Sequence, residues 1–216
     1  FGSVGGAVVS PTLYQVYSPY GNSALTPQEN TTAELGFEKS FLNKKVVFTG
    51  AIFYREDDNS IVFGNLPSPP WGQYVNIAGI SKSKGFETNV VIKPIQKVTV
   101  SGNYTFVEND ALIARFVAKH RANANLSFDI TKNISWIAQY QYINQRDVAY
   151  FDSVTYTTLA TEVPSYQLVH TNLSVNVSSN LSLFAAVQNI FNEDFIETVG
   201  FTSRGRNFKL GLNLKF

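Results

Sequence analysis

Residues 207–216 read NFKLGLNLKF, and every second side chain in this stretch is apolar. Phe208, Leu210, Leu212, Leu214 and Phe216 alternate with asparagine, lysine and glycine. Successive side chains of a β-strand point to opposite faces of its sheet, so the stretch predicts a strand with one apolar and one polar face. Such a strand suits a wall that separates an apolar medium from water.

The same two-residue period recurs along the chain. It is clearest at residues 97–107 and 120–130, where apolar side chains again occupy one face and Asn, Ser and Thr much of the other. We interpret less regular stretches as further strands at residues 1–9, 33–40, 46–54, 74–93, 134–142, 173–177 and 181–187. The pattern predicts about ten strands, near the ~9–11 residues that a tilted strand needs to cross a bilayer, and no apolar run approaches the ~18 residues of a transmembrane helix.

The connections between these strands alternate in length. Short links are predicted at residues 42–44, 94–96, 131–133 and 178–180. Long polar links are predicted at residues 10–30, 56–73, 108–118, 147–164 and 192–205. Alternation of this kind is typical of outer-membrane β-barrels, which have tight periplasmic turns and long extracellular loops. It is not expected of a soluble β-sandwich, which is the alternative all-β fold.

Composition is compatible with both of these folds. Hydrophobic residues make up 44% of the chain, aromatic residues 14% and charged residues 15%, which is low for a soluble domain and suits a lipid-facing wall. The net charge of +1 gives no reason to expect a nucleic-acid partner. The chain has no cysteine, which excludes disulfides and thiolate metal sites.

The end of the chain carries a candidate assembly signal. Lys209, Gly211, Leu214 and Phe216 match the polar-x-Gly-x-x-apolar-x-aromatic signal that the barrel assembly machinery reads in bacterial outer-membrane proteins. With the long links outside, the last strand runs inward and ends in the periplasm, where this signal is expected. We therefore expect the C-terminal strand to bind the assembly machinery.

Four groups of motifs resemble TonB-dependent outer-membrane receptors. The first is PTLYQVY at residues 11–17 with YGNSALTP at residues 20–27, and the second is ELGFE at residues 34–38. The others are YVNI at 74–77 with GFE at 85–87, and VQNIFN at 187–192 with GF at 200–201 and GR at 205–206. Departures from the family pattern are few: Gln28 replaces the usual acidic residue, Phe195 the usual Tyr, and Ser203 the common Pro or Ala.

The resemblance implies a fold and a function. It implies an all-β, antiparallel transmembrane β-barrel of 22 strands, of which residues 1–216 would form about the last ten, with the plug domain outside this chain. It implies energy-coupled uptake of a large, scarce nutrient across the bacterial outer membrane. Residues 17–21 are most similar to the cobalamin-receptor-like branch, so a corrinoid is the first expectation and an iron chelate the second. The implied partners are outer-membrane lipid, the TonB complex through the plug, and the nutrient itself.

No catalytic or metal-binding constellation is evident. The two histidines, His120 and His170, fall on separate predicted strands, so no nucleophile–base pair is expected and the protein is predicted not to be an enzyme. Asp57 and Asp58 lack the spacing of an EF-hand and are interpreted as a solvated loop tip. No cofactor and no metal are predicted.

Aromatic side chains in the long links are the candidate ligand-binding residues, because rigid rings give a large contact area at little entropic cost. The candidates are Tyr14, Tyr17, Tyr20, Trp71, Tyr150 and Tyr156. An interfacial girdle of Tyr and Trp is the alternative role for these rings, and it is the one favoured for Trp136, Tyr140 and Tyr142.

Two further alternatives remain from the sequence. The chain could be a complete ten-stranded barrel such as an outer-membrane protease, although such an enzyme needs acidic and His residues together at the rim. It could also be a barrel fragment held by the assembly machinery, in which case something must cover the edge at residues 1–9, because unpaired backbone groups in lipid cost several kcal/mol each.

Overall fold

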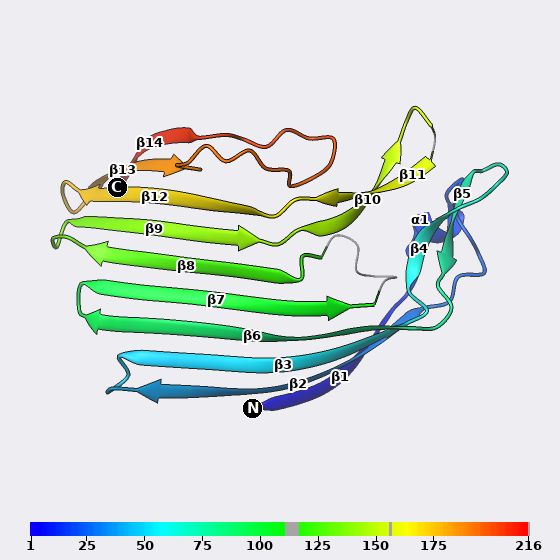
Figure 1. Cartoon of the computed structure of the whole chain (residues 1–216), viewed down its shortest axis with the longest axis horizontal. Helices are drawn as coiled ribbons and strands as arrows, with labels where there is room; N and C mark the ends of the chain where they lie inside the picture. The colour runs from blue at the N-terminus through cyan, green and yellow to red at the C-terminus, as the bar shows by residue number, and fades with distance from the viewer. Residues whose placement is uncertain (111–116, 156, 216) are drawn as a thin grey trace.

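A computed structural model describes residues 1–110, 117–155 and 157–215 of the chain. Its main element is one antiparallel sheet of ten strands, laid side by side in chain order (Figure 1). These strands are β1 (Gly2–Val9), β2 (Gln28–Phe41), β3 (Val46–Asp58), β6 (Ile80–Ile95), β7 (Val98–Asn109), β8 (His120–Asp129), β9 (Ile134–Ile143), β12 (Tyr166–Asn176), β13 (Leu181–Gln188) and β14 (Asn207–Leu214). The prediction of an all-β antiparallel fold with about ten wall strands is confirmed.

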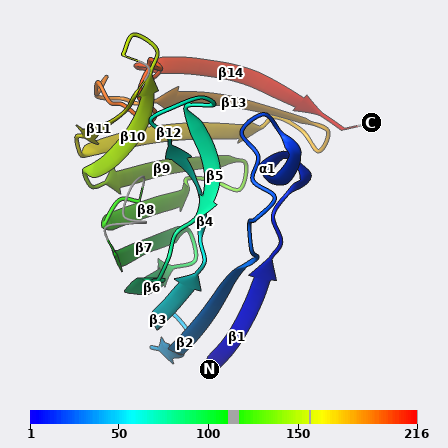
Figure 2. The same ribbon diagram turned by 90° about the vertical axis from the view of Figure 1, so that its right-hand side faces the viewer.

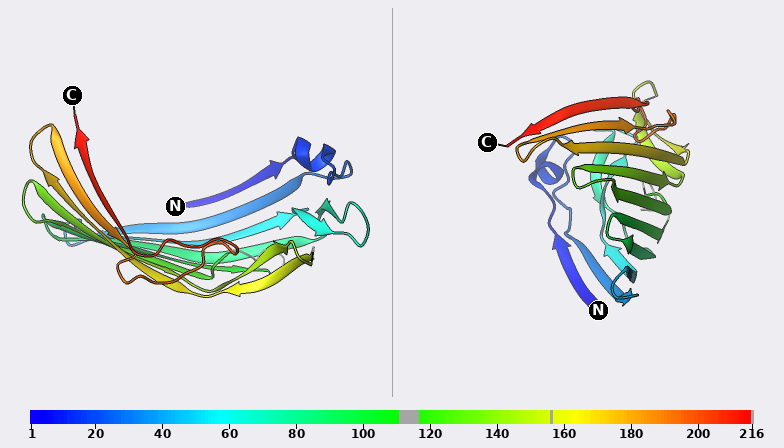
Figure 3. Two further views of the ribbon diagram at one scale, coloured as in Figure 1. Left: turned by 90° about the horizontal axis from the view of Figure 1, so that it is seen from above. Right: turned by 90° about the vertical axis from the view of Figure 1, so that its left-hand side faces the viewer.

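The sheet is curved into a trough with β1 and β14 at its two edges (Figures 2 and 3). Within the described residues no ladder joins β1 to β14, so the ten strands do not form the closed ten-stranded barrel that was an alternative. The same part of the chain contains no second large sheet, which rules out the β-sandwich. No helix among the described residues is long and apolar enough to cross a membrane.

The register gives the sheet one apolar and one polar face, as the two-residue period predicts. On the apolar face Leu126 stands beside Val100 and Ala138 of the adjacent strands. On the polar face the Asn123 amide donates to Asn103 Oδ1 at 2.8 Å, and β8 and β9 are joined in the same way by polar side chains. The apolar side chains of β14 are largely uncovered, Leu210 being 85% exposed. Such a surface needs lipid or another apolar partner.

Buried apolar side chains are few and lie at one end of the sheet. Among the described residues they are Ala118, Val148, Val163, Tyr166 and Leu168. All five surround the place where the strands pass into the long links. The wall itself has no apolar core, and hydrogen-bond ladders hold it together, as expected of a membrane-spanning sheet.

Short and long links alternate as predicted. The short ones are residues 42–45, 96–97, 130–133 and 177–180, and all lie at one end of the strands (Figure 1). The first is made by three successive residues with positive φ, Leu42, Asn43 and Lys44. The long links lie at the other end, which we name the outer rim.

The long links contain regular structure that the sequence analysis did not predict. They hold the helix α1 (Leu13–Tyr17) and two hairpins, β4 (Ile61–Asn65) with β5 (Gly72–Asn76) and β10 (Arg146–Asp152) with β11 (Thr157–Val163). The prediction of residues 74–93 as one stretch was wrong, because the chain turns at Gly79, whose φ is 99°, between β5 and β6. β2 and β3 also extend further toward the rim than expected.

Candidate functional site

The helix α1 lies near the start of the link between β1 and β2 and carries its own start signal. Thr12 Oγ1 accepts from the Gln15 amide at 3.2 Å, and Gln15 Oε1 accepts from the Thr12 amide at 2.8 Å, which together form a capping box. Such reciprocal bonds satisfy two of the backbone donors that every helix start leaves free. The Thr-x-x-Gln pattern was therefore the signal from which this helix could have been predicted.

The segment after α1 docks on the β4–β5 hairpin through side-chain amides. Asn22 Nδ2 donates to the Tyr74 carbonyl oxygen at 3.1 Å, and Asn76 exchanges two bonds with the Thr26 backbone at 2.9 and 3.0 Å. These partners are about 50 residues apart in the chain. Residues 10–27 and the β4–β5 hairpin thus form one unit, which we name the first loop assembly.

Gly21 lies where two backbone segments of this unit approach closely. A Cβ atom on Gly21 would come within 2.5 Å of the Val16 carbonyl oxygen, so a larger residue would push the docked segment off α1. The backbone of Gly21 also accepts a hydrogen bond from Gln73 Nε2 at 3.0 Å. The motifs at residues 20–27 and 74–77 are therefore two halves of one contact surface.

Aromatic rings fill the first loop assembly. Phe63 packs edge-on against Tyr20 and Tyr74, with ring centroids 5.7 and 5.3 Å apart, and Tyr14 approaches Tyr74 at 6.2 Å. Two of the candidate ligand residues, Tyr14 and Tyr20, are thus partly engaged in packing. Phe63 was not predicted, since strand alternation alone does not indicate which rings meet.

The other candidates of this region lie outside the ring cluster. The Tyr17 side chain is 78% exposed at the end of α1. Trp71 precedes β5 and is also exposed. Both rings remain available to a ligand.

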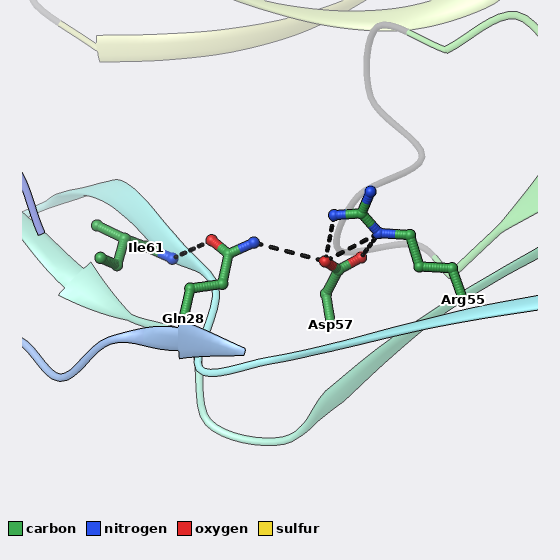
Figure 4. A network of polar contacts seen from close by, with 4 residues as sticks. All are labelled: Gln28, Arg55, Asp57 and Ile61. Atoms are coloured by element: carbon green, nitrogen blue, oxygen red, sulfur yellow. Dashed lines mark hydrogen bonds and ion pairs between the residues drawn. The ribbon is translucent and has the colours of Figure 1, made fainter. Parts of the chain in front are cut away.

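A polar network anchors the first loop assembly to the wall, on the polar face of β2 and β3 (Figure 4). Arg55 binds the Asp57 carboxylate through Nε and Nη2, at 2.8 and 2.5 Å, and Asp57 is only 5% exposed. Gln28 Nε2 contacts Asp57 at 3.5 Å, and its Oε1 accepts from the Ile61 amide at 3.4 Å. The interpretation of Asp57 as part of a solvated loop tip was wrong, because β3 continues through it.

This network also explains one departure from the family pattern. The usual acidic residue at position 28 would place a second carboxylate beside Asp57, and like charges at that distance repel. The neutral amide of Gln28 donates to one partner and accepts from the other.

The link between β13 and β14 is fixed by two asparagines with positive φ, a conformation that asparagine tolerates well. The buried Asn189 side chain exchanges two hydrogen bonds with the Glu193 backbone, both at 2.9 Å, and the Asn189 amide donates to His170 Nδ1 at 3.0 Å. Asn192 Oδ1 accepts from the Arg206 amide at 2.8 Å. The motifs at residues 187–192 and 205–206 thus close one loop.

This loop meets the β10–β11 hairpin, and we name residues 189–206 with that hairpin the second loop assembly. Arg146 Nη2 donates to the Glu197 carbonyl oxygen at 2.7 Å. The rings of Phe195 and Tyr166 pack against each other at a tilt of 38° with centroids 4.8 Å apart, a contact that needs no hydroxyl at position 195. Beneath the hairpin is a cavity of about 350 Å³.

Tyr150 lines this cavity together with Tyr166, Arg121 and Arg146. The structure therefore places Tyr150 apart from the tyrosines of the first loop assembly. Tyr156 lies outside the described residues. The six candidate aromatic residues do not form a single cluster among the residues that the structure describes.

The two histidines lie on opposite faces of the sheet. His120 is on the apolar face beside Phe106 and contacts the Tyr104 hydroxyl at 2.6 Å through Nδ1. His170 is on the polar face, where it accepts from Asn189. They cannot act on one substrate group. No cluster of His, Asp and Glu suited to a metal occurs in the described part of the chain.

The favoured girdle residues all come from β9. Trp136 Nε1 donates to Thr171 Oγ1 at 2.7 Å, and the Tyr140 and Tyr142 hydroxyls donate to Gln167 and Asn144. The three rings alternate with Ile137 and Gln139 and so belong to the apolar face of the sheet. This is the position that an interfacial girdle requires.

Three residues of the candidate assembly signal lie on β14, and Phe216 lies outside the described residues. Leu214 is exposed on the apolar face, and Lys209 is on the polar face with Gly211. The ring of Phe184 on β13 covers Gly211, so a Cβ atom there would collide with it. Covering a strand glycine with an aromatic ring of the next strand is a known way to fix register.

The chain is similar to known TonB-dependent receptors. The TonB dependent receptor-like β-barrel model matches residues 1–190. The chain is 26% identical over 99% of its length to the vitamin B12 transporter BtuB of Vibrio cholerae. It covers 34% of that protein and so spans about a third of the curated relatives that it matches.

Solved structures share the fold at lower identity. The pyoverdine outer membrane receptor FpvA of Pseudomonas aeruginosa matches all of the chain with a TM-score of 0.77 at 16% identity, over 33% of its own length. The ferric enterobactin receptor PfeA of the same species gives a TM-score of 0.75 at 18% identity, over 38% of its length. The copper transporter OprC gives a TM-score of 0.78 at 15% identity, over 36% of its length.

Proposed function

The chain belongs to the TonB-dependent receptors of the bacterial outer membrane, and on this premise we propose that it is the nutrient-binding wall of an energy-coupled importer. The family match over residues 1–190 is the observation that carries the proposal. A corrinoid is the first candidate for the nutrient, and an iron chelate is the second. The first choice is supported by the 26% identity to a vitamin B12 transporter, and the second by the fold shared with pyoverdine and enterobactin receptors.

We propose that the nutrient binds at the outer rim, on the polar face of the trough. Both loop assemblies lie there, and each presents aromatic and polar side chains. Tyr14, Tyr17, Tyr20, Trp71, Tyr150 and Tyr156 are the ligand-contacting residues in this proposal. Transport rather than catalysis is assigned, since the chain belongs to a family of receptors and resembles a transporter.

Residues 1–216 are proposed to be the C-terminal ten wall strands of a 22-stranded barrel. The edge strands β1 and β14 would then pair with the remaining strands of the barrel, so that every backbone N–H and C=O group within the lipid has a hydrogen-bond partner. The plug and its TonB-binding segment would lie upstream. The intact mass of the native protein tests this: a protein several-fold larger than 24.0 kDa supports it, and one near that mass contradicts it.

Uptake in cells tests the function. A strain that lacks the full-length gene is grown on limiting cyanocobalamin or on ferric siderophores as the sole source, with and without a functional TonB. The proposal expects a growth defect on one of these nutrients that the intact gene restores only when TonB works. Unchanged growth and uptake on all of them would contradict it.

The assembly role of β14 is a separate proposal. An amphipathic edge strand is a template for strand addition, and β14 offers one whose apolar face is uncovered. Replacing Leu214 and Phe216 together with Asp should slow insertion of the full-length protein into the outer membrane, measured by heat-modifiable mobility in pulse-chase samples. Replacing Lys215 with Asp, on the other face, is the matched control. Normal insertion of the double variant would show that β14 is not the signal.

A further inference from the structure

The cavity beneath the β10–β11 hairpin has two arginines in its lining. Arg121 is the second residue of β8 and shares the polar face of the sheet with Asn123, and Arg146 begins β10. Ile143, the last residue of β9, pairs with Arg121 and is followed three residues later by Arg146, and Gln141 of β9 also lines the cavity. Two arginines from different strands thus line one hollow at the outer rim, and Arg121 is exposed there.

The Arg146 guanidinium is only partly satisfied. Its Nη2 donates to the Glu197 carbonyl oxygen at 2.7 Å, whereas its Nη1 is buried and has no hydrogen-bond partner among the described residues. Arginine stays charged at any physiological pH, and a desolvated charged donor is strongly destabilising when it is unpaired. Because Nη1 is closed to solvent in the structure, an acceptor would reach it only after the Arg146 side chain shifts, and it would then remove that penalty.

Neither arginine has a carboxylate partner in the described part of the chain. The three ion pairs found there use Arg55, Lys82 and Lys84. Glu197 is the one acidic residue in the lining, and it is exposed and meets Arg146 through its backbone. The cavity therefore carries an excess of positive charge.

We propose that this cavity binds an oxyanion, a carboxylate or a phosphate, that is carried by the imported nutrient. The proposal rests on the importer function and specifies its ligand. Guanidinium groups bind planar or tetrahedral oxyanions through paired N–H donors, and two of them converging on one hollow select charge as well as shape. A volume of about 350 Å³ holds such a group with its immediate neighbours, while the bulk of a large nutrient would lie against the exposed rings of the rim.

Titration calorimetry on the purified full-length receptor tests the site without knowledge of the nutrient. Sodium phosphate and sodium citrate are titrated separately at constant ionic strength, with sodium chloride as the reference anion. The wild type should bind at least one of them, and the two titrations distinguish a phosphate from a carboxylate site. Arg121→Gln, which breaks no hydrogen bond seen in the structure, should weaken that binding by roughly 10- to 100-fold.

Two more variants separate recognition from structure. Arg146→Lys keeps the charge but loses the paired donors, so it should also weaken binding by about tenfold or more. Arg204→Gln removes the same charge from an exposed position of the neighbouring loop and should leave binding unchanged. Equal losses in Arg121→Gln and Arg204→Gln, with binding unchanged in Arg146→Lys, would indicate a diffuse electrostatic effect and overturn the proposal.

Three further outcomes of the binding and import measurements also test the proposed anion site. A wild type that binds neither anion, with Arg121→Gln and Arg146→Lys lowering the melting temperature, would mean that the arginines serve another part of the protein. A receptor that binds anions through these arginines but imports none of the tested nutrients would overturn the proposed function and leave the site standing. Normal import together with no anion binding would overturn the site alone.

Discussion

The first and second loop assemblies lie at the same rim, and asparagine side chains bonded to backbone groups hold both together. In the first, Asn22 and Asn76 join segments far apart in the chain, and aromatic rings fill the space between them. In the second, Asn189 closes a local loop, and a cavity remains beneath the hairpin. The buried side-chain atoms without a partner in the described residues, Arg146 Nη1 and Asn207 Oδ1, both lie in or next to the second assembly. From this difference we infer that the first assembly is the more firmly packed of the two, and we propose that the second carries more of the ligand recognition.

The largest expected effect is that of Asn189→Ala. The change removes two hydrogen bonds to Glu193 and puts alanine where φ is positive, so we expect residues 190–206 to lose about 3 kcal/mol of local stability. Amide hydrogen exchange of the full-length receptor measures this loss. Thr202→Ala, at an exposed position of the same loop, should change little. Unchanged exchange in Asn189→Ala would mean that the loop is fixed elsewhere.

A somewhat smaller effect is expected for Asn76→Ala in the first loop assembly. Its side chain also donates to the Asn59 carbonyl oxygen at 2.7 Å, so its loss should cost about 2 kcal/mol and free residues 21–27 from the hairpin. Limited proteolysis should then cleave that segment faster. Asn65→Ala, an exposed asparagine of the same hairpin, is the control. Equal cleavage of both variants would show that aromatic packing alone docks the segment.

Substitutions of Tyr20 and Tyr17 test which rings of the first loop assembly support its structure and which contact the ligand. Tyr20→Ala should cost the first loop assembly about 1 kcal/mol through its lost contact with Phe63. Tyr17→Ala should leave hydrogen exchange unchanged, because its ring is exposed, and should lower nutrient affinity by a few-fold. If Tyr17→Ala binds normally and Tyr20→Ala loses affinity, the ring cluster is itself the binding surface.

The smallest expected effect concerns pH. Hydrogen bonds from the Thr155 hydroxyl and the Val154 and Thr155 amides lower the pKa of Asp152 at the tip of the β10–β11 hairpin. The pKa of Asp152 is lower in the folded turn than in the unfolded chain, where it is about 3.9. The ionised carboxylate therefore stabilises the turn above that pH, and this stabilisation is lost as the pH falls through the pKa of the folded turn. Relative to the intrinsic rate, which itself falls with pH, exchange of the turn amides should therefore accelerate slightly below about pH 4, and Asp152→Asn should abolish that dependence. The same acceleration in Asp152→Asn would assign it to another group.

Local sequence rules predicted the wall because apolar and polar residues alternate within each of its strands. The alternation in residues 120–130 and 207–216 needed no knowledge of neighbouring strands, and the alternating link lengths placed the rim. The hairpins in the long links were missed, since their short strands alternate weakly and are defined by pairing with each other. Asp57 was misplaced for a related reason, because it contacts Gln28 of the paired strand β2 as well as Arg55 of its own strand.

The sequence by itself determined the antiparallel wall, its apolar and polar faces, and the family to which the chain belongs, because each of these is written in residues close together along the chain. Tertiary structure decided which residues meet at the rim. It joined Asn22 to Tyr74 and brought Arg121 and Arg146 into one cavity. Such contacts depend on where the strands end relative to one another and on which polar atoms remain unpaired after the sheet has formed. Neither of these can be predicted from the residue pattern within a single segment of the chain.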